Sequence, residues 1–155
     1  MTDRFSKFTL LVTEAYRQIH RIADKELKTY GLKGQHAILV KSLFEHCDGL
    51  TSTQLTEYCG KDKADVSRFL LAMKKKGIIE TEDSESGAYR AKHRLTESGM
   101  RIAYQLQKRI EEVVKIAGAD IDEGDRVIFY DALESIATNL RRIADGEVSA
   151  KGKGK

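Results

Sequence analysis

Hydrophobic residues near the start of the chain recur every three or four positions, which is the period of an amphipathic helix. The repeat predicts a long helix that ends at Gly31, with apolar positions at Phe5, Phe8, Val12, Ala15, Tyr16, Ile19, Ile22, Ala23 and Leu27. The next segment, GQHAILVKSLF, is apolar on most sides, which indicates a helix buried within a domain, with Gly49 as its predicted C-terminal cap. Because the chain has no proline, we expect glycines and capping residues to set the helix ends.

Two short helices are predicted in the middle of the chain. Thr51 and Gln54 form a capping box that begins the first helix, which runs through Tyr58 and ends at Gly60. Asp62 is the predicted N-cap of the second helix. One face of this second helix is apolar, with Val66, Phe69, Leu70 and Met73, and the opposite face carries Lys61, Ala64, Arg68 and Lys75. Two short helices around a glycine turn, with basic and small residues facing outward, are typical of a helix-turn-helix.

The pattern changes to alternation after Gly77. GIIETE is predicted to be a short strand, DSESG a turn and AYRAKHRLT a return strand. Successive side chains of a strand point to opposite sides, so one side would carry Tyr89, Ala91, His93 and Leu95 and the other Arg90, Lys92 and Arg94. A helix-turn-helix followed by a basic hairpin predicts a winged helix, in which a helix enters the major groove of DNA and the hairpin follows the adjacent backbone or minor groove.

Two further helices are predicted after the hairpin. Thr96 is expected to cap the first, which keeps a helical apolar period to about Gly118. The second has an apolar stripe that is wider than packing on a small domain needs, made of Val127, Ile128, Leu133, Ile136, Ala137, Leu140 and Ile143. Because the N-terminal helix is equally apolar, we expect the two termini to interlock in a twofold homodimer.

The composition is consistent with one intracellular domain. The chain has 155 residues, 33% of them charged, and a net charge of +3, so any affinity for DNA depends on where the charges lie. Arg4, Lys7 and Glu14 interrupt the N-terminal segment, which is atypical of a signal peptide, and we expect a cytoplasmic protein. The predicted domain covers 1–145, with a winged core at about 33–96, dimerisation helices at about 4–30 and 97–145, and a disordered basic tail at 146–155.

Cysteines and histidines offer little sign of a metal or cofactor site. Cys47 and Cys59 are too few for a disulfide framework and do not have the spacing of paired zinc ligands, so we expect reduced thiols and no cofactor. The histidines are expected to be packed or hydrogen-bonded rather than ligands. The adjacent His46 and Cys47, with Cys59 possible nearby, leave a redox-sensing or metal-sensing regulator open as an alternative.

The segments LTSTQLTEYCGKDKADVSRFLLAMKKKGIIE and YRAKHRLTESG resemble the multiple antibiotic resistance regulator (MarR) family of bacterial transcription factors. The positions that carry the resemblance are Leu50, Thr51, Gly60, Asp62, Lys63, Val66, Ser67, Arg68, Lys76, Gly77, Leu95, Thr96, Glu97 and Gly99. The resemblance implies a homodimeric regulator of transcription, with a small, often phenolic effector in the crevice between the dimer helices and the winged domain. The wing tip departs from the family pattern, because SESGAYR stands where an Asp-x-Arg element is common, and Glu80, Glu82, Asp83 and Glu85 make this region acidic.

The expected function is therefore binding of double-stranded DNA, as a repressor at a palindromic operator. The outward side of the second short helix is expected to meet the major groove, with Lys61, Lys63, Ala64, Asp65, Ser67 and Arg68. Thr51 and Ser52 would contact phosphates at a helix N-terminus, and Tyr89, Arg90 and Lys92 would contact DNA from the wing. The sequence has no glycine-rich phosphate loop after a strand and no nucleophile elbow, so an enzyme is not expected. A dimeric winged-helix module that binds proteins instead of DNA remains an alternative.

Overall fold

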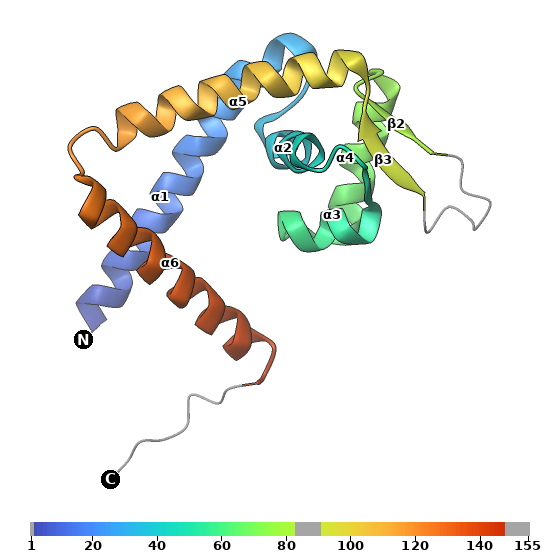
Figure 1. The fold of residues 1–155 in the computed structure, drawn as a ribbon. Helices are drawn as coiled ribbons and strands as arrows, with labels where there is room; N and C mark the ends of the chain where they lie inside the picture. Colours follow the sequence, from blue (N-terminus) through green and yellow to red (C-terminus); the bar gives the residue numbers. More distant parts are fainter. Residues whose placement is uncertain (1, 83–90, 148–155) are drawn as a thin grey trace. The chain divides into compact units, whose positions relative to one another are not determined.

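A computed structural model describes residues 2–82 and 91–147 of the chain (Figure 1). The chain divides into two compact units, Met1–Glu111 and Glu112–Lys155, with the boundary inside one long helix. The first unit holds α1 (Thr2–Leu27), α2 (Ala37–Glu45), α3 (Ser52–Cys59), α4 (Lys63–Lys75), most of α5 (Glu97–Ala117), the short 3-10 helices η1 (Lys28–Tyr30) and η2 (Gly34–His36), and strands β1 (Leu50–Thr51), β2 (Ile79–Thr81) and β3 (Lys92–Leu95). The predicted fold class, mainly α with a small β wing in a winged helix-turn-helix, is confirmed.

The wing is part of a three-stranded antiparallel sheet with strand order β1-β3-β2. The predicted hairpin corresponds to β2 and β3, while β1 is a third strand that the sequence pattern did not predict. Two residues are too few to show the alternation by which a strand is recognised. The central strand places His93 between Leu50 on β1 and Thr81 on β2, and this register ties the wing to the residues that begin α3.

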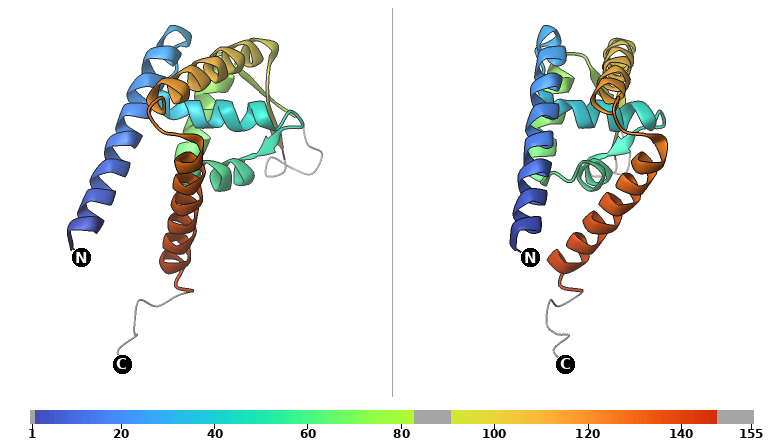
Figure 2. Two further views of the ribbon diagram at one scale, coloured as in Figure 1. Left: turned by 60° about the vertical axis from the view of Figure 1, so that its left-hand side comes forward. Right: turned by 90° about the vertical axis from the view of Figure 1, so that its left-hand side faces the viewer.

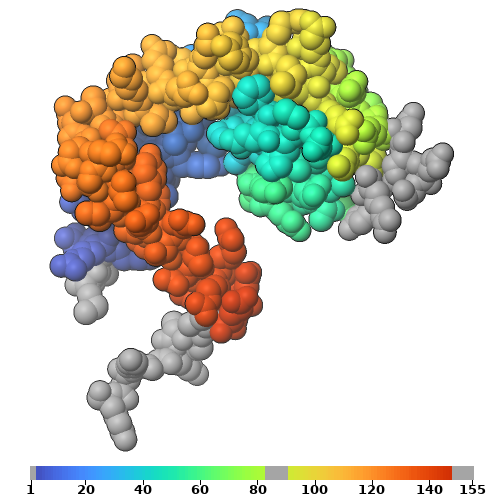
Figure 3. All heavy atoms as spheres, in the orientation of Figure 1, coloured from blue at the N-terminus to red at the C-terminus, as the bar shows by residue number. Residues whose placement is uncertain are grey.

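The buried faces of the helices form one core in the first unit. Val66, Leu70 and Met73 of α4 are buried in it, as the helical period predicts, and Phe69 packs against it partly buried. Side chains of α2, α3 and the start of α5 also contribute to this core, together with Leu27 of α1, Leu50 of β1 and Ile79 of β2, and Figure 3 shows α2 and α3 beside the start of α5. The C-terminal half of α1 packs against η2, while its N-terminal half extends away from α2, α3 and α4 (Figure 2). Because this core buries one side of α4, the opposite side of the helix is exposed to solvent.

Capping residues set most helix ends as predicted. Gly31, in the left-handed region with φ 65°, follows the end of α1 and η1, and Thr96 accepts a hydrogen bond from the Gly99 N–H (3.1 Å) at the start of α5. The predicted cap at Gly49 was wrong, because α2 ends at Glu45 with His46 as its C-cap. The His46 ring nitrogen Nδ1 donates to the Ser42 carbonyl (2.8 Å), so a side chain satisfies the helix end before Gly49 is reached.

The second unit contains the end of α5 and the helix α6 (Glu123–Ala144). The Asp122 side chain caps α6 by accepting from the Asp125 N–H (2.9 Å). None of the side chains of α6 is buried in the single chain, and the predicted apolar stripe is largely exposed, with Ile128 at 68%. Within the described residues, no helix combines the length and apolar character that a membrane span needs.

Candidate nucleic-acid interface

The helix-turn-helix is built by two caps and one glycine. The Thr51 hydroxyl accepts from the Gln54 N–H (3.3 Å), and the Gln54 side chain accepts from the Thr51 N–H (2.9 Å), so the predicted capping box begins α3. Gly60 ends α3 in the left-handed region, with φ 57°. Asp62 then caps α4 by accepting from the Asp65 N–H (2.8 Å), and this hydrogen bond lowers the pKa of the Asp62 carboxyl. These local signals place α4 directly after a tight turn.

The side of α4 opposite the core carries the predicted major-groove residues. Lys63, Ala64, Ser67 and Arg68 are exposed, and Asp65 is half-buried. The Arg68 guanidinium forms an ion pair with the Asp65 carboxylate three residues earlier. Small side chains at Ala64 and Ser67 leave the helix backbone accessible beside this arginine, which is the arrangement that lets a helix approach base edges.

Lys61 lies before α4 and has a partner in another helix. Its Nζ donates to the Tyr16 hydroxyl of α1 (3.1 Å) and lies 5.9 Å from the centroid of the Tyr16 ring. Tyr16 in turn packs edge-on against His20, with ring centroids 4.3 Å apart. Lys61 thus joins the turn of the helix-turn-helix to α1, and its ammonium group keeps two further N–H donors for other acceptors.

The predicted phosphate and wing residues converge on the small sheet. Thr51 and Ser52 stand at the start of α3, and the Ser52 hydroxyl lies 3.0 Å from Nε2 of His93. Lys92 donates from Nζ to the Asp48 carbonyl (3.3 Å), and Arg94 donates to the same oxygen (3.0 Å). The predicted wing residues Tyr89 and Arg90 lie outside the described residues.

The basic side of β3 is partly neutralised. Arg94 forms an ion pair with Glu82, with a nitrogen to oxygen distance of 2.5 Å. The alternation in the sequence correctly places Lys92 and Arg94 on one side of β3, but it could not reveal that both side chains reach the loop before β1. That contact depends on the pairing of β1 with β3, which joins segments far apart in the sequence.

Two further titratable groups, His36 and Cys59, are buried within the fold. The His36 ring accepts from the Lys33 N–H at Nδ1 (3.0 Å) and packs against Phe69, with ring centroids 4.8 Å apart, and burial lowers the pKa of His36. Cys59 is buried beside Ser42, with Sγ 3.8 Å from the hydroxyl oxygen, and burial raises the pKa of its thiol. A raised thiol pKa opposes redox reactivity. In residues 2–82 and 91–147, no three histidine, cysteine or carboxylate side chains form a group that could hold a metal ion.

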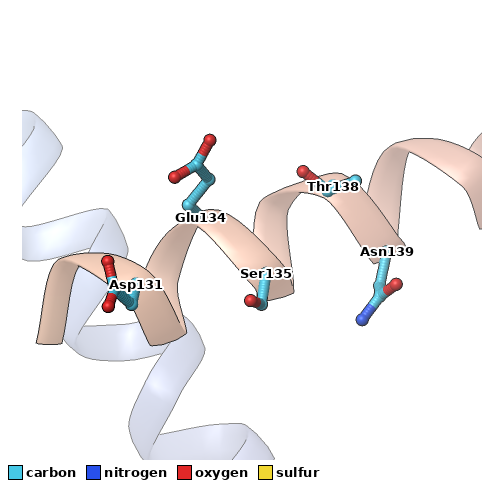
Figure 4. A pocket seen from close by; sticks show the side chains of 5 residues that line it. All are labelled: Asp131, Glu134, Ser135, Thr138 and Asn139. Atoms are coloured by element: carbon cyan, nitrogen blue, oxygen red, sulfur yellow. The ribbon is translucent and has the colours of Figure 1, made fainter. Parts of the chain in front are cut away.

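A shallow hollow lies on α6 in the second unit. Its lining consists of Asp131, Glu134, Ser135, Thr138 and Asn139 (Figure 4). All five side chains come from one helix and all are polar, whereas a site for an apolar effector needs convergent apolar walls. The hollow therefore does not have the lining expected of an apolar effector site.

Comparison with known proteins identifies the fold. No model of a protein family and no curated protein sequence matches the chain. A MarR transcriptional regulator from Methanosarcina mazei Go1 superposes with a TM-score of 0.79 at 20% identity, over 89% of this chain and 99% of that one. A MarR family regulator from Rhodococcus sp. RHA1 gives a TM-score of 0.72 at 17% identity, over 85% and 94% of the two chains.

A third similar structure contains DNA. The chain is similar to MepR of S. aureus in the crystal structure of its DNA complex, with a TM-score of 0.77 at 16% identity. The match covers 85% of this chain and 97% of that chain. The proteins from M. mazei and Rhodococcus sp. are named as transcriptional regulators, and MepR is named as a transcription regulator of the S. aureus multidrug efflux pump MepA. This chain has the winged-helix fold of MarR family transcription regulators, as its sequence motifs predict.

Proposed function

We propose that this protein is a homodimeric transcription regulator that binds a near-palindromic DNA operator. The observation that carries the proposal is the exposed face of α4, where Lys63, Ala64, Ser67 and Arg68 stand opposite a fully packed apolar face. The likeness to MepR, which has been crystallised with DNA, supports the same use of the fold. Binding to duplex DNA would repress transcription by occupying sequence that the polymerase needs.

Recognition would divide between base edges and phosphates. Arg68 would donate two parallel hydrogen bonds to a guanine in the major groove, and Ala64 and Ser67 would allow the close approach that this needs. Thr51 and Ser52 would contact a phosphate at the N-terminus of α3, where the helix dipole favours an anion. Lys92, with Tyr89 and Arg90 of the wing, would contact the backbone or minor groove.

The exposed apolar residues support a homodimer. In the first unit, α1 exposes large apolar side chains, among them Phe5, Leu10, Leu11 and Ile19. In the second unit, α6 exposes Val127, Ile128, Phe129 and Leu140. A soluble chain rarely leaves so many large apolar side chains in water, and a twofold partner would cover both helices. Two copies of α4 would then meet half-sites roughly 34 Å apart, which predicts a near-palindromic operator.

We also propose that a small effector controls DNA binding. It follows from the resemblance to the family, in which an often phenolic ligand changes the spacing of the two recognition helices. A ligand can shift this spacing only if it binds one arrangement more tightly than the other. Thermal denaturation with and without phenolic compounds would show whether such a ligand binds, because a ligand of the folded state raises the melting temperature. A weaker affinity for the selected duplex in the presence of a compound that binds would then show that it changes DNA binding.

The test of DNA binding is selection of duplexes from a random-sequence library by the purified protein. The proposal predicts that the selected duplexes share a near-palindrome whose half-sites are about one helical turn apart. A gel-shift titration should then show tight binding to the selected duplex and weaker binding to a scrambled duplex of equal length. Selected duplexes with no common sequence, or equal binding to both duplexes, would contradict sequence-specific recognition.

A protein-binding module is the second candidate, and one observation favours it. Glu82 neutralises Arg94 at the base of the wing, so the wing is less basic than its arginines and lysines suggest. A module of this kind would bind no duplex, whereas a DNA-binding protein loses affinity steeply as salt is added, because phosphate contacts release counterions. The salt dependence of binding therefore separates the two candidates.

A further inference from the structure

His93 joins the wing sheet to the beginning of α3. It occupies the central strand, opposite Leu50 on one side and Thr81 on the other. Its half-buried ring has Nε2 3.0 Å from the Ser52 hydroxyl oxygen and Nδ1 3.1 Å from the Thr81 hydroxyl oxygen. One imidazole therefore bridges the helix N-terminus and the wing through two hydrogen bonds.

The burial of this ring, more than the charges around it, disfavours its protonation in the free protein. Burial and then the Lys74 ammonium of α4 lower the pKa of His93 below its ordinary value. The ring is hydrogen-bonded to Ser52 and Thr81, and His93 lies opposite Leu50, all of which are uncharged. The strand β3 also packs against α2, where the charged residues Lys41 and Glu45 form an ion pair with each other. The charged residues next to His93 along β3 have other partners, because Lys92 and Arg94 both donate to the Asp48 carbonyl. On the neighbouring strand side, Glu82 pairs with Arg94, and Glu80 lies opposite Arg94 and is exposed to solvent.

The two protonation states of the ring orient the Ser52 hydroxyl differently. A neutral imidazole has one donor and one acceptor nitrogen, and a hydroxyl can accommodate either. In the imidazolium both nitrogens donate, so the hydroxyls of Ser52 and Thr81 must both accept. The hydroxyl hydrogen of Ser52 is then available for another acceptor. A phosphate at the N-terminus of α3 would accept it, and its negative charge would stabilise the imidazolium.

We propose that His93 is a positioning residue that couples DNA binding to the uptake of a proton. In the complex, doubly protonated His93 holds the Ser52 hydroxyl toward the phosphate and keeps the wing sheet attached to α3. This inference rests on the proposed DNA-binding function and adds pH to what regulates it. A group that binds its proton more tightly in the complex than in the free protein takes up a proton on binding, so the affinity for DNA rises as pH falls.

The first experiment measures the dissociation constant for the selected duplex, at constant ionic strength, between about pH 8 and about pH 6, the range in which histidine ordinarily titrates. In the proposed dimer each copy of His93 would take up one proton, and one proton changes affinity by at most tenfold per pH unit. The wild-type protein should therefore bind about threefold to tenfold more tightly per half-site at the lower pH. His93→Gln keeps one donor and one acceptor but cannot be protonated. It should bind like the wild type at about pH 8 and lose most of the pH dependence.

His46→Gln is the matched control. His46 lies at the end of α2, where its ring contacts the Ser42 carbonyl and packs against Tyr58, with ring centroids 4.8 Å apart. This variant should keep the pH dependence of the wild type. Equal pH dependence in the wild type and His93→Gln, or a flat profile in the wild type, would overturn the proposal while leaving DNA binding intact.

The second experiment needs no variant and does not depend on how His93→Gln folds. The ring protons of His93 are followed by NMR as pH is changed, in the free wild-type protein and in its complex with the selected duplex. The proposal expects a pKa below the ordinary histidine value in the free protein and a higher pKa in the complex. The same pKa in both states would overturn it. A wild-type protein that binds no duplex at any pH would refute the proposed function, and this inference with it.

Discussion

The guanidinium of Arg68 is paired with the carboxylate of Asp65 on the outward side of α4. The Arg68 side chain is still 73% exposed, and the Asp65 side chain is 31% exposed. An exposed ion pair between residues three apart on a helix contributes less than about 1 kcal/mol. Asp65 therefore holds the guanidinium over the exposed face of α4 without preventing its transfer to a guanine.

Replacement of Arg68 tests its assignment to the major groove. Arg68→Ala should weaken binding to the selected duplex by about 1–3 kcal/mol per half-site, because a bidentate contact to guanine is lost. Because the side chain is exposed, the free energy of unfolding should change by no more than about 0.5 kcal/mol. Gel-shift titration and urea denaturation measure the two quantities. Arg68→Lys, which keeps the charge but not the planar fork, is the control and should also lose discrimination between bases.

If Arg68→Ala binds the selected duplex with unchanged affinity, Arg68 does not contribute to the DNA interface. A uniform loss of affinity for selected and scrambled duplexes would assign Arg68 to a phosphate instead of a base, since phosphate contacts carry no sequence information.

Removal of the Asp65 carboxylate, the partner of Arg68, should strengthen nonspecific binding to DNA. Asp65→Asn keeps the size of the side chain but removes a negative charge from the surface that is proposed to bind DNA. Affinity for a scrambled duplex should increase by roughly 0.5–1 kcal/mol at low salt, the order of one unscreened surface interaction. The preference for the selected duplex should fall, because Arg68 is no longer held by Asp65. Fluorescence anisotropy with both duplexes gives this ratio, and an unchanged ratio would show that Asp65 does not position Arg68.

His36 makes stability depend on pH. Burial, the largest cause, lowers the pKa of this histidine in the folded protein, so the unfolded chain binds a proton more readily. The stabilisation is fully present above about pH 6.5, the ordinary histidine value, and is lost as pH falls from there toward the lowered folded pKa. Urea denaturation of the wild type and His36→Gln should show a steeper fall in the free energy of unfolding for the wild type. Parallel falls would mean that His36 is not the group responsible.

Charge placed on the apolar stripe of α6 tests the homodimer. Ile128→Glu should convert the dimer to a monomer at micromolar concentration, because a buried unpaired carboxylate at an interface is strongly unfavourable. Thr138→Glu, on the polar hollow of the same helix, is the matched control and should leave the dimer intact. Sedimentation equilibrium measures the mass of each. A wild-type monomer, or a dimer that persists in Ile128→Glu, would exclude this face of α6 as the contact.

Local signals made much of the fold predictable. Thr51, Asp62 and Thr96 cap helices through hydrogen bonds to residues three positions away, so their roles can be inferred from short segments. The buried side of α4 follows equally from the helical period of Val66 and Met73. The same period therefore predicted which residues of α4 face outward, although their contact with DNA stays a prediction.

Contacts between segments that are distant in the sequence could not be predicted from it. The bond from Lys61 to Tyr16 joins residues 45 positions apart, and that from Ser52 to His93 joins residues 41 apart. Neither pair has a periodic or spacing signal, because each depends on how whole helices and strands pack. The end of α2 was also predicted at the wrong residue. The ring of His46 caps this helix through a hydrogen bond, which the composition of the segment does not reveal.

The most direct measurement of the central claim is the affinity of the wild-type protein for the selected duplex as a function of salt. If the outward side of α4 and the start of α3 bind DNA, the logarithm of the association constant falls linearly with the logarithm of the salt concentration. The association constant should fall by about 100-fold or more between roughly 50 and 200 mM salt. Absence of duplex binding even at the lowest salt concentration, or an affinity that does not change with salt, would contradict the account.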